Sequence, residues 1–310
     1  MLNFKSLTKE ITNHFRRLAI LFLNIAFNRP IVFRLVGHLN RRRRFLSSVF
    51  VAYPASEEYA LAYVYPQHRH LMRWRPWPVG VFKQNGKWGI TFVISSTEGD
   101  FIKHDNIDNL NQLVLYTEKI RGLLVADQKT FAGILPSVLF GKGILCDAIE
   151  ADVTVASVIK AEEKVRIVEN LEESTPLIIL GSKGFIGKRL ISKLIGREVY
   201  EIDIADNNTK EWPCHLQGRK TILINLTRKA ALNNYFNYFW PDLVLLNEVY
   251  PEPTVTELSK IIAQGCKAYH VVGVIAKTYP SFPKAYKGGI PCCAARLTDE
   301  MNVIIRKITP

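Results

Sequence analysis

Three glycines near the middle of the chain are spaced so that they could bring the backbone close to an anionic ligand. Gly181, Gly184 and Gly187 form the pattern G-x-x-G-x-x-G. In such a pattern the first glycine makes a tight turn, the second lets the backbone approach a pyrophosphate, and the third lets a helix pack against a strand. We therefore predict a dinucleotide-binding loop. Its residues are Gly181, Ser182, Lys183, Gly184, Phe185, Ile186 and Gly187.

The segments around this loop have the patterns of a strand, a helix and a second strand. The apolar run 177–180 is typical of a buried parallel strand, and apolar residues at helical spacing follow the last glycine. The second strand, 198–203, ends at Asp203, where a carboxylate can bind ribose hydroxyls. That carboxylate would repel the 2′-phosphate of NADP, whereas Lys183 and Lys188 would attract it. We expect NAD or NADP as the cofactor, with NAD favoured.

Two adjacent cysteines near the end of the chain are the best candidates for covalent chemistry. Cys292 and Cys293 follow Pro291, and proline is common in the first turn of a helix. We therefore predict a helix that begins here and stabilises the thiolate of Cys292. A thiolate beside a nicotinamide could attack a thioester and pass the acyl group to hydride. Alternatively, both cysteines are small buried residues between a helix and a sheet.

Other side chains could act at the predicted strand ends without a covalent step. Lys277 or Tyr250 could handle a proton. Asn225 and Thr227 follow another predicted strand, and ligands of open α/β sheets bind at the carboxyl ends of strands. We count both among the cofactor-binding residues. The five cysteines and seven histidines show no metal-ligand spacing, so we expect reduced thiols and no metal.

The second half of the chain alternates short apolar strands with helical or loop segments. We expect a helix over 152–170 and further strands over 222–225, 243–246 and 269–272. This alternation favours an α/β fold with a doubly wound parallel-sheet Rossmann domain. A smaller α+β domain is expected before it. Its predicted elements are a strand over 48–53, a hairpin over 79–95 that turns at Asn85–Gly86, a helix over 106–119 and a strand over 123–126.

The first 44 residues carry most of the excess positive charge. They contain ten Lys or Arg and one Glu, in a chain whose net charge is +13. Their apolar run 18–27 is too short to span a bilayer. We predict a basic amphipathic helix that lies on an anionic membrane surface. Alternatively, this helix packs on the protein's own body with its arginines solvated. Nucleic acid is not an expected partner, because no recognition module surrounds the arginines at 41–44.

Several segments occur in an order known from one family of reductases. These segments are Gly86–Lys87, 131–137, the helix through Thr154, 181–187, 247–251 and Cys292–Cys293. Their order resembles that of the long-chain acyl–acyl carrier protein reductases, which make fatty aldehydes. The resemblance implies an N-terminal substrate domain, a linking helix, a Rossmann domain and Cys292 as the nucleophile. The order is also similar to that of the shikimate dehydrogenase and glutamyl-tRNA reductase group, whose substrates are polar.

The predicted organisation has three parts. They are a basic leader over 1–47, an α+β substrate domain over 48–150, and a linker helix with the Rossmann domain over 151–310. We expect an NAD(P)-dependent reductase of an acyl thioester or related carbonyl that gives an aldehyde. The alternatives are a dehydrogenase of a soluble metabolite without a covalent step and a non-catalytic, nucleotide-sensing, membrane-docked protein. Expected partners are the substrate, an acyl carrier protein and an anionic membrane; the expected location is the cytoplasm, peripheral on the inner face of a membrane.

Overall fold

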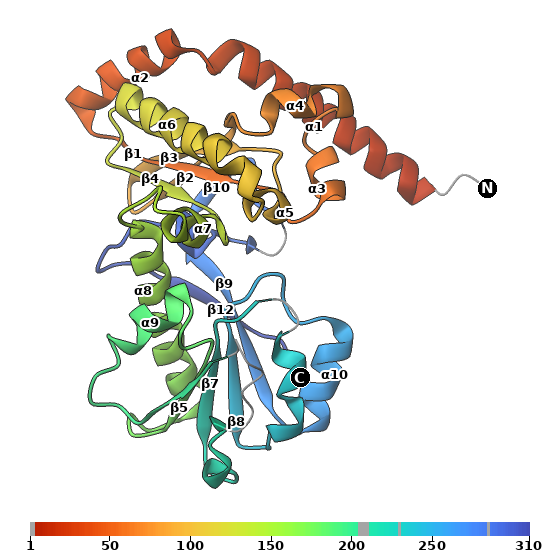
Figure 1. Ribbon diagram of the computed structural model, residues 1–310, viewed down its shortest axis with the longest axis vertical. Helices are drawn as coiled ribbons and strands as arrows, with labels where there is room; N and C mark the ends of the chain where they lie inside the picture. Colours follow the sequence, from red (N-terminus) through yellow and green to blue (C-terminus); the bar gives the residue numbers. More distant parts are fainter. Residues whose placement is uncertain (1–3, 204–210, 229–230, 284–285) are drawn as a thin grey trace. The chain divides into compact units, whose positions relative to one another are not determined.

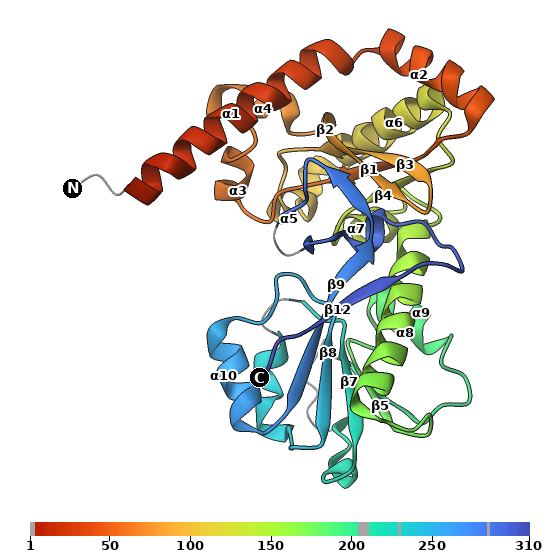
Figure 2. The same cartoon turned by 180° about the vertical axis from the view of Figure 1, so that it is seen from behind.

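The chain forms two compact units, each with its own β-sheet (Figures 1 and 2). The computed structural model describes residues 4–203, 211–228, 231–283 and 286–310. Unit 1 comprises Met1–Glu150 and two later segments, Ala276–Phe282 and Cys293–Arg296. Unit 2 comprises Ala151–Ile275, Pro283–Cys292 and Leu297–Pro310. The predicted leader and substrate domain both fall within unit 1.

The sheet of unit 1 is mixed. Its strands are β1 (Leu46–Ala52), β2 (Trp77–Gln84), β3 (Lys87–Val93), β4 (Gln128–Phe131) and β10 (Lys277–Tyr279), in the order β10-β2-β3-β1-β4. β1 is parallel to β3 and β4, whereas β2 is antiparallel to β3 and β10. The predicted hairpin is confirmed as β2 and β3. Asn85 and Gly86 both have positive φ, 47° and 80°, as a type I′ turn requires.

The helices of unit 1 cover its sheet and bury an aromatic-rich core. They are α1 (Phe4–Phe27), α2 (Pro30–Arg43), α3 (Glu57–Leu61), α4 (Arg69–Met72), α5 (Glu98–Phe101), α6 (Ile107–Leu124) and α7 (Leu135–Gly141). The predicted helix over 106–119 is confirmed as α6, but the predicted strand over 123–126 is wrong. α6 continues to Leu124, and Val125 ends it in a left-handed conformation with φ 53°. Phe33 of α2, Leu113 of α6 and Phe92 of β3 belong to one buried cluster.

The sheet of unit 2 is built on five parallel strands. Its members are β5 (Leu177–Leu180), β6 (Val199–Ile202), β7 (Thr221–Asn225), β8 (Leu243–Asn247), β9 (Lys267–Ile275), β11 (Gly289–Ile290) and β12 (Val303–Lys307). The order is β11-β9-β8-β7-β5-β6, and β12 also pairs with β9. β5 to β9 are parallel, whereas β11 and β12 are antiparallel to β9. The predicted α/β class is confirmed.

The helices of unit 2 lie on both sides of this sheet. They are α8 (Ile149–Glu169), which enters from unit 1, α9 (Phe185–Ile191) and α10 (Val255–Ala263). α8 and α9 lie on one side and α10 on the other (Figures 1 and 2). Every residue of β5, β7 and β8 is buried, as strands covered on both faces should be. The arrangement is compatible with a Rossmann-like fold.

The chain changes direction across the sheet between β5 and β7. From β5 it moves outward to β6 and then returns past β5 to form β7. The loops that leave the carboxyl ends of β5 and β7 therefore run to opposite sides of the sheet. In open α/β sheets a crevice opens at such a switch point, and ligands bind there.

Candidate functional site

The glycine loop that follows β5 is packed so tightly that two of its glycines cannot be replaced without movement. Gly181 has φ +92°, a left-handed conformation that favours glycine. A Cβ on Gly187 would lie 2.2 Å from the carbonyl oxygen of Gly181, so α9 rests directly on the turn. A Cβ on Gly181 would lie 3.1 Å from the carbonyl oxygen of Leu226, in the loop after β7. The predicted loop thus lies at the switch point.

Hydrogen bonds hold this loop in one conformation and leave one hydroxyl without a partner. The N–H groups of Gly181 and Ser182 both donate to the carbonyl of Ile202, at 2.9 and 3.2 Å. The N–H of Gly184 donates to the carbonyl of Gly181 at 3.0 Å. The side chain of Ser182 is 1% exposed, and its Oγ has no hydrogen-bond partner within the described ranges. A buried hydroxyl of this kind is satisfied when a ligand supplies the missing group.

The predicted ribose-binding acid carries a cation of the loop beside it. Asp203 follows β6, and its Oδ2 lies 3.5 Å from the Nζ of Lys183. The lysine side chain is 64% exposed and the aspartate side chain 17%. Lys183 reduces the negative potential at Asp203.

Asn225 and Thr227 lie together at the end of β7 and adjoin the loop. The Oδ1 of Asn225 accepts from the backbone N–H and the hydroxyl of Thr227, at 3.2 and 2.7 Å. The Cγ2 of Thr227 would lie 3.4 Å from a Cβ on Gly181. The structure therefore brings these two predicted residues and the glycine loop to one edge of the sheet.

Sequence reasoning missed a chain of buried polar groups along the same edge. Asn225, Asn247 and His270 are register partners on β7, β8 and β9. Asn225 Nδ2 donates to Asn247 Oδ1 at 2.7 Å, and Asn247 Nδ2 lies 3.1 Å from His270 Nδ1. On the far side, His270 Nε2 is 3.9 Å from a carboxylate oxygen of Glu252, which pairs with Arg306. Polar residues at the ends of two apolar runs were the only available signal.

The chain of groups ends in a histidine that is neutral near neutral pH. His270 is 2% exposed, and burial lowers the pKa of its ring. If Asn247 donates to Nδ1, the proton of the neutral ring lies on Nε2, which faces Glu252. The edge thus offers a positioned imidazole, two amides and a hydroxyl.

The three predicted catalytic residues belong to different parts of the chain. Tyr250 follows β8, is 39% exposed and stacks on Tyr286 with ring centroids 5.4 Å apart. Lys277 is an exposed residue of β10 and belongs to unit 1, whereas Tyr250 and Cys292 belong to unit 2. The structure therefore gives no common catalytic cluster within one unit.

The predicted helix after Pro291 is wrong. Cys292–Ala294 form a single 3₁₀ turn, and the next element is β12. β12 must reach the edge of β9, and its ladder of hydrogen bonds replaces those that a helix would have made. Cys292 is buried at 8% exposure. The stabilisation of its thiolate by a helix N-terminus is therefore lost.

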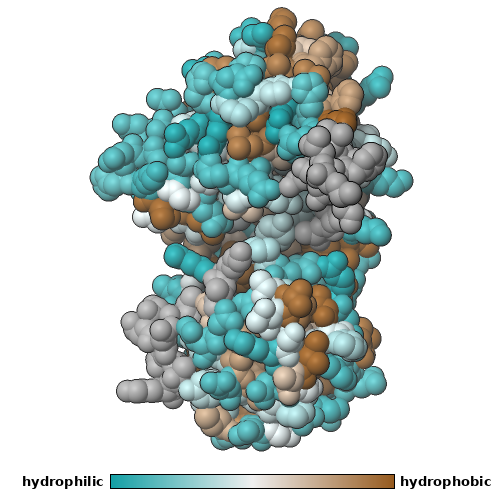
Figure 3. All heavy atoms as spheres, turned by 90° about the vertical axis from the view of Figure 1, so that its right-hand side faces the viewer, coloured by the Kyte–Doolittle hydropathy of each residue, from teal (hydrophilic) through white to brown (hydrophobic). Residues whose placement is uncertain are grey.

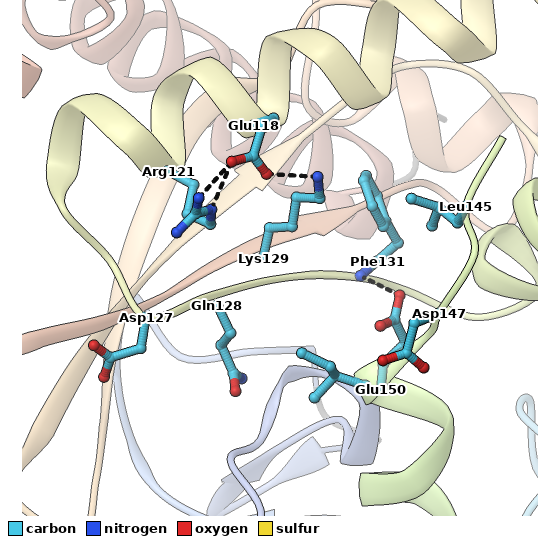
Figure 4. A pocket seen from close by; sticks show the side chains of 10 residues that line it. Glu118, Arg121, Asp127, Gln128, Lys129, Phe131, Leu145, Asp147 and Glu150 are labelled. Atoms are coloured by element: carbon cyan, nitrogen blue, oxygen red, sulfur yellow. Dashed lines mark hydrogen bonds and ion pairs between the residues drawn. The ribbon is translucent and has the colours of Figure 1, made fainter.

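Unit 1 contains a cavity of about 260 Å³ lined by charged side chains (Figure 4). Glu118 of α6 accepts hydrogen bonds from Arg121 Nε at 2.9 Å and from Lys129 Nζ at 2.6 Å. The hydrogen bond from Arg121, together with the bond and charge of Lys129, lowers the pKa of Glu118 to about 2. The residues that line the cavity are Glu118, Arg121, Asp127, Gln128, Lys129, Phe131, Leu145, Asp147, Ile149 and Glu150.

Glu150 differs sharply from Glu118 within this cavity. It lies on the other side, below Phe131, whose N–H donates to its Oε1 at 3.2 Å (Figure 4). Glu150 is 4% exposed, and burial raises its pKa to about 7. The cavity therefore holds one carboxyl group that is ionised at neutral pH and one that titrates near neutral pH. Such a lining suits a polar ligand better than a fatty acyl chain.

Two comparisons with known proteins find no match for this chain. No protein-family model matches the sequence, and a search of curated proteins finds no significant match. Within the described residues, no group of three or more His, Cys, Asp or Glu could hold a metal ion. The function must therefore be argued from the geometry alone.

Proposed function

We propose that unit 2 is a doubly wound Rossmann domain that binds NAD or NADP, and that the protein is a reductase of an acyl thioester or related carbonyl. The observation that carries the proposal is the glycine packing at the switch point. Gly187 contacts the turn at Gly181, and Gly181 faces the loop after β7. The strand order β6-β5-β7-β8-β9 is a doubly wound order whose switch point lies between the first and third strands, where ligands of such sheets bind.

The residues at this edge fit a dinucleotide. Gly181–Gly187 bring the backbone of the turn and of the start of α9 close to a pyrophosphate, and the unsatisfied hydroxyl of Ser182 supplies a hydrogen-bond donor. Asp203 binds the adenosine ribose, and Lys183 admits a 2′-phosphate. Asn225 and Thr227 line the same crevice. Bound in its reduced form, the cofactor supplies a hydride to a carbonyl carbon.

A covalent step is the finer part of the proposal. The Cys292 thiolate attacks the thioester carbon, and the carrier thiol leaves with the proton that Cys292 gives up. The acyl group then accepts hydride at the same carbon, the bond to Cys292 breaks, and an aldehyde is released. Cys292→Ala should abolish turnover of a thioester while the affinity for NAD(P)H stays within about twofold, because the thiol makes no part of the loop. Unchanged turnover would remove the covalent step.

The charged cavity of unit 1 favours a second candidate function. A dehydrogenase or reductase of a soluble, polar metabolite needs no covalent step and no acyl channel. Four carboxyl groups and two cations line the cavity (Figure 4). In this case Lys277, Tyr250 or the buried His270 would handle the proton, and loss of Cys292 would be tolerated.

One experiment separates these candidates from a non-catalytic nucleotide sensor. Consumption of NADH and NADPH is followed with acyl thioesters of carrier protein and coenzyme type, and with small polar carbonyl compounds. Oxidation with thioesters supports the first candidate, and oxidation with polar carbonyls supports the second. Nucleotide binding without any turnover supports a sensor. Absence of nucleotide binding by titration calorimetry would overturn all three.

We further propose that the basic amphipathic leader holds the protein at the cytoplasmic face of a membrane, where an acyl carrier protein could deliver an apolar substrate. Among the described residues, α1 and α2 carry large apolar side chains on their outer faces. This docking is independent of nucleotide binding and can be tested separately.

A further inference from the structure

The outer faces of α1 and α2 each carry a row of exposed large apolar residues. Along each helix its members recur every three or four residues, which places them on one face. Each is between 44% and 67% exposed. Exposed apolar surface of this extent marks an interaction site in a folded protein. We call these residues the apolar stripe: Ile11, Phe15, Leu18, Phe22 and Ile25 of α1, with Ile31, Leu35 and Leu39 of α2.

The inner faces of the same helices are fixed to unit 1. Ile20 packs in a buried cluster with Met72 and Trp77. A Cβ on Gly37 would lie 2.0 Å from the carbonyl oxygen of Leu123, so α2 and α6 touch through their backbones. Asn40 Nδ2 donates to the carbonyls of Leu46 and Val125, at 2.8 and 2.7 Å. The stripe therefore cannot turn inward to be covered by its own unit.

The pictures agree with this arrangement. α1 and α2 run along one edge of unit 1, and α6 lies beneath α2 (Figures 1 and 2). Figure 3 shows apolar side chains at the top of unit 1, where α1 and α2 run in Figure 1. The stripe thus has an outward direction that the rest of unit 1 determines.

Positive charge borders the stripe. α2 contains no acidic residue, and Arg34, Arg41, Arg42 and Arg43 are all exposed. Apolar side chains flanked by arginines complement a membrane surface, where an acyl boundary lies beneath anionic phosphates. A second copy of the chain is a poorer partner, because symmetric contact through the stripe would bring two arginine clusters together.

The geometry favours a helix pair that lies in the plane of the membrane. No single helix among the described residues is both long and apolar enough to cross a bilayer. α1 and α2 satisfy that length and composition only together, with a bend of 75° between them. Crossing would also require Asn40 and Gly37 to leave α6 and β1, which would expose buried backbone groups.

We infer that α1 and α2 lie flat in the headgroup region of an anionic membrane and insert the apolar stripe to the acyl boundary, while the arginines of α2 bind lipid phosphates. The inference rests on the membrane docking proposed above and is independent of the cofactor. It names the inserted residues and the lipid chemistry, so it can fail while nucleotide binding stands.

The test uses the full chain and vesicles of phosphatidylcholine, with or without an equal amount of phosphatidylglycerol. Co-sedimentation should show strong binding to the anionic vesicles, weak binding to the neutral ones, and loss of binding with rising salt. Phe22→Glu and Leu35→Glu should each lower the partition coefficient by about tenfold or more, since each removes the burial of a large apolar side chain. Arg41→Ala with Arg42→Ala should weaken only anionic binding, by about tenfold or more.

A matched control introduces glutamate at exposed apolar residues that lie outside the apolar stripe. Ile195 and Val255 of unit 2 are 88% and 81% exposed and lie outside the stripe. Ile195→Glu with Val255→Glu should bind vesicles as the wild type does. NAD(P)H titration of every variant reports failure of the nucleotide site separately.

Three outcomes would overturn the inference. The first is wild-type partitioning of Phe22→Glu and Leu35→Glu. The second is a dimer that the same substitutions dissociate, without vesicle binding, in sedimentation velocity. The third is quenching of the tryptophan fluorescence of a Phe22→Trp variant by lipids that carry bromine deep in their acyl chains. This result would indicate that the bent helix pair crosses the bilayer. Quenching by shallow bromines alone supports the in-plane orientation.

Discussion

The two units gather different kinds of polar group. In unit 2, β7 to β9 present amides, a hydroxyl and a neutral imidazole, all joined by hydrogen bonds. In unit 1, α6 and β4 line a cavity where carboxylates and cations pair. Neutral groups keep their geometry as pH changes, whereas charged ones respond to it. The sheet edge of unit 2 is therefore suited to positioning a ligand, and the cavity of unit 1 is suited to recognising a charged one.

The largest expected effect concerns the backbone contact of the unit 2 edge. Gly187→Ala places a Cβ 2.2 Å from the carbonyl oxygen of Gly181 and should lower the free energy of unfolding by about 3 kcal/mol or more. Binding of NAD(P)H should be lost with it. Urea unfolding and calorimetry measure the two effects.

Gly122→Ala is the control for this substitution. Gly122 is an exposed residue of α6, and an added Cβ would meet no atom within 4 Å. The alanine should raise the free energy of unfolding by about 0.5–1 kcal/mol through helix propensity. Equal behaviour of the two variants would contradict the tight packing of the loop.

The second-largest effect is expected for the hydrogen-bonded polar groups of Asn225, Asn247 and His270 in unit 2. Asn247→Leu leaves the amide of Asn225, the carbonyl of Val249 and the ring of His270 without their partner. We expect a loss of about 2–4 kcal/mol in the free energy of unfolding, because these groups are buried. Asn233→Leu, at an exposed asparagine, should cost less than about 0.5 kcal/mol. Similar losses at both positions would mean that the chain of hydrogen bonds adds no stability.

The contribution of the charged cavity to the free energy of unfolding should change with pH, unlike that of the neutral polar groups in unit 2. The pKa of Glu150 is raised from 4.5 to about 7, so wild-type stability falls as pH rises between these values. Glu150→Gln should match the wild type below pH 4.5 and exceed it by about 3 kcal/mol above pH 7. Unfolding in urea at a series of pH values measures this difference.

Glu118 supplies a control of opposite sign in the same cavity. Its pKa is lowered from 4.5 to about 2, so its contribution to stability is present above pH 4.5 and is lost as pH falls toward 2. Glu118→Gln should therefore be less stable than the wild type at pH 7, by less than about 1 kcal/mol because the side chain is partly exposed. A pH-independent difference for both glutamine variants would refute the contrast between the two carboxyl groups.

The smallest effect is expected at the loop lysine. Lys183→Ala removes an exposed ion pair with Asp203 and should change the free energy of unfolding by less than about 0.5 kcal/mol. It should nevertheless lower the affinity for NADP relative to NAD by a few-fold, since Asp203 then acts alone. The ratio of the two dissociation constants is the measurement. An unchanged ratio would show that Lys183 does not contact the 2′ position.

Local steric demands explain what the sequence could predict. The turn at Asn85–Gly86 and the loop at Gly181–Gly187 each depend on backbone conformations that few residues allow, so their residue types disclose them. The strands over 222–225 and 243–246 were predictable because burial on both faces demands unbroken apolar runs.

Pairing between strands that are distant in sequence explains most of what the sequence could not predict. His270 meets Asn247 only through the register of β8 and β9, which no local pattern specifies. The segment after Cys292 has helix-compatible residues, but β12 must pair with β9. Val125 extends an apolar run that resembles a strand, yet it ends α6 with a left-handed residue. For His270 and for the segment after Cys292, a strand distant in sequence or in register decided the local structure.

The interleaving of the two units constrains how the protein is made. The chain passes between the units after Glu150, Ile275, Phe282, Cys292 and Arg296. β10, an edge strand of the first sheet, is thus synthesised after β5 to β9 of the second unit. During synthesis, the sheet of unit 1 therefore lacks its edge strand β10 until residues 277–279 have left the ribosome. A gene cut once at residue 150 would separate β10 and Cys293–Arg296 from the rest of unit 1, so the first fragment could not form the complete unit.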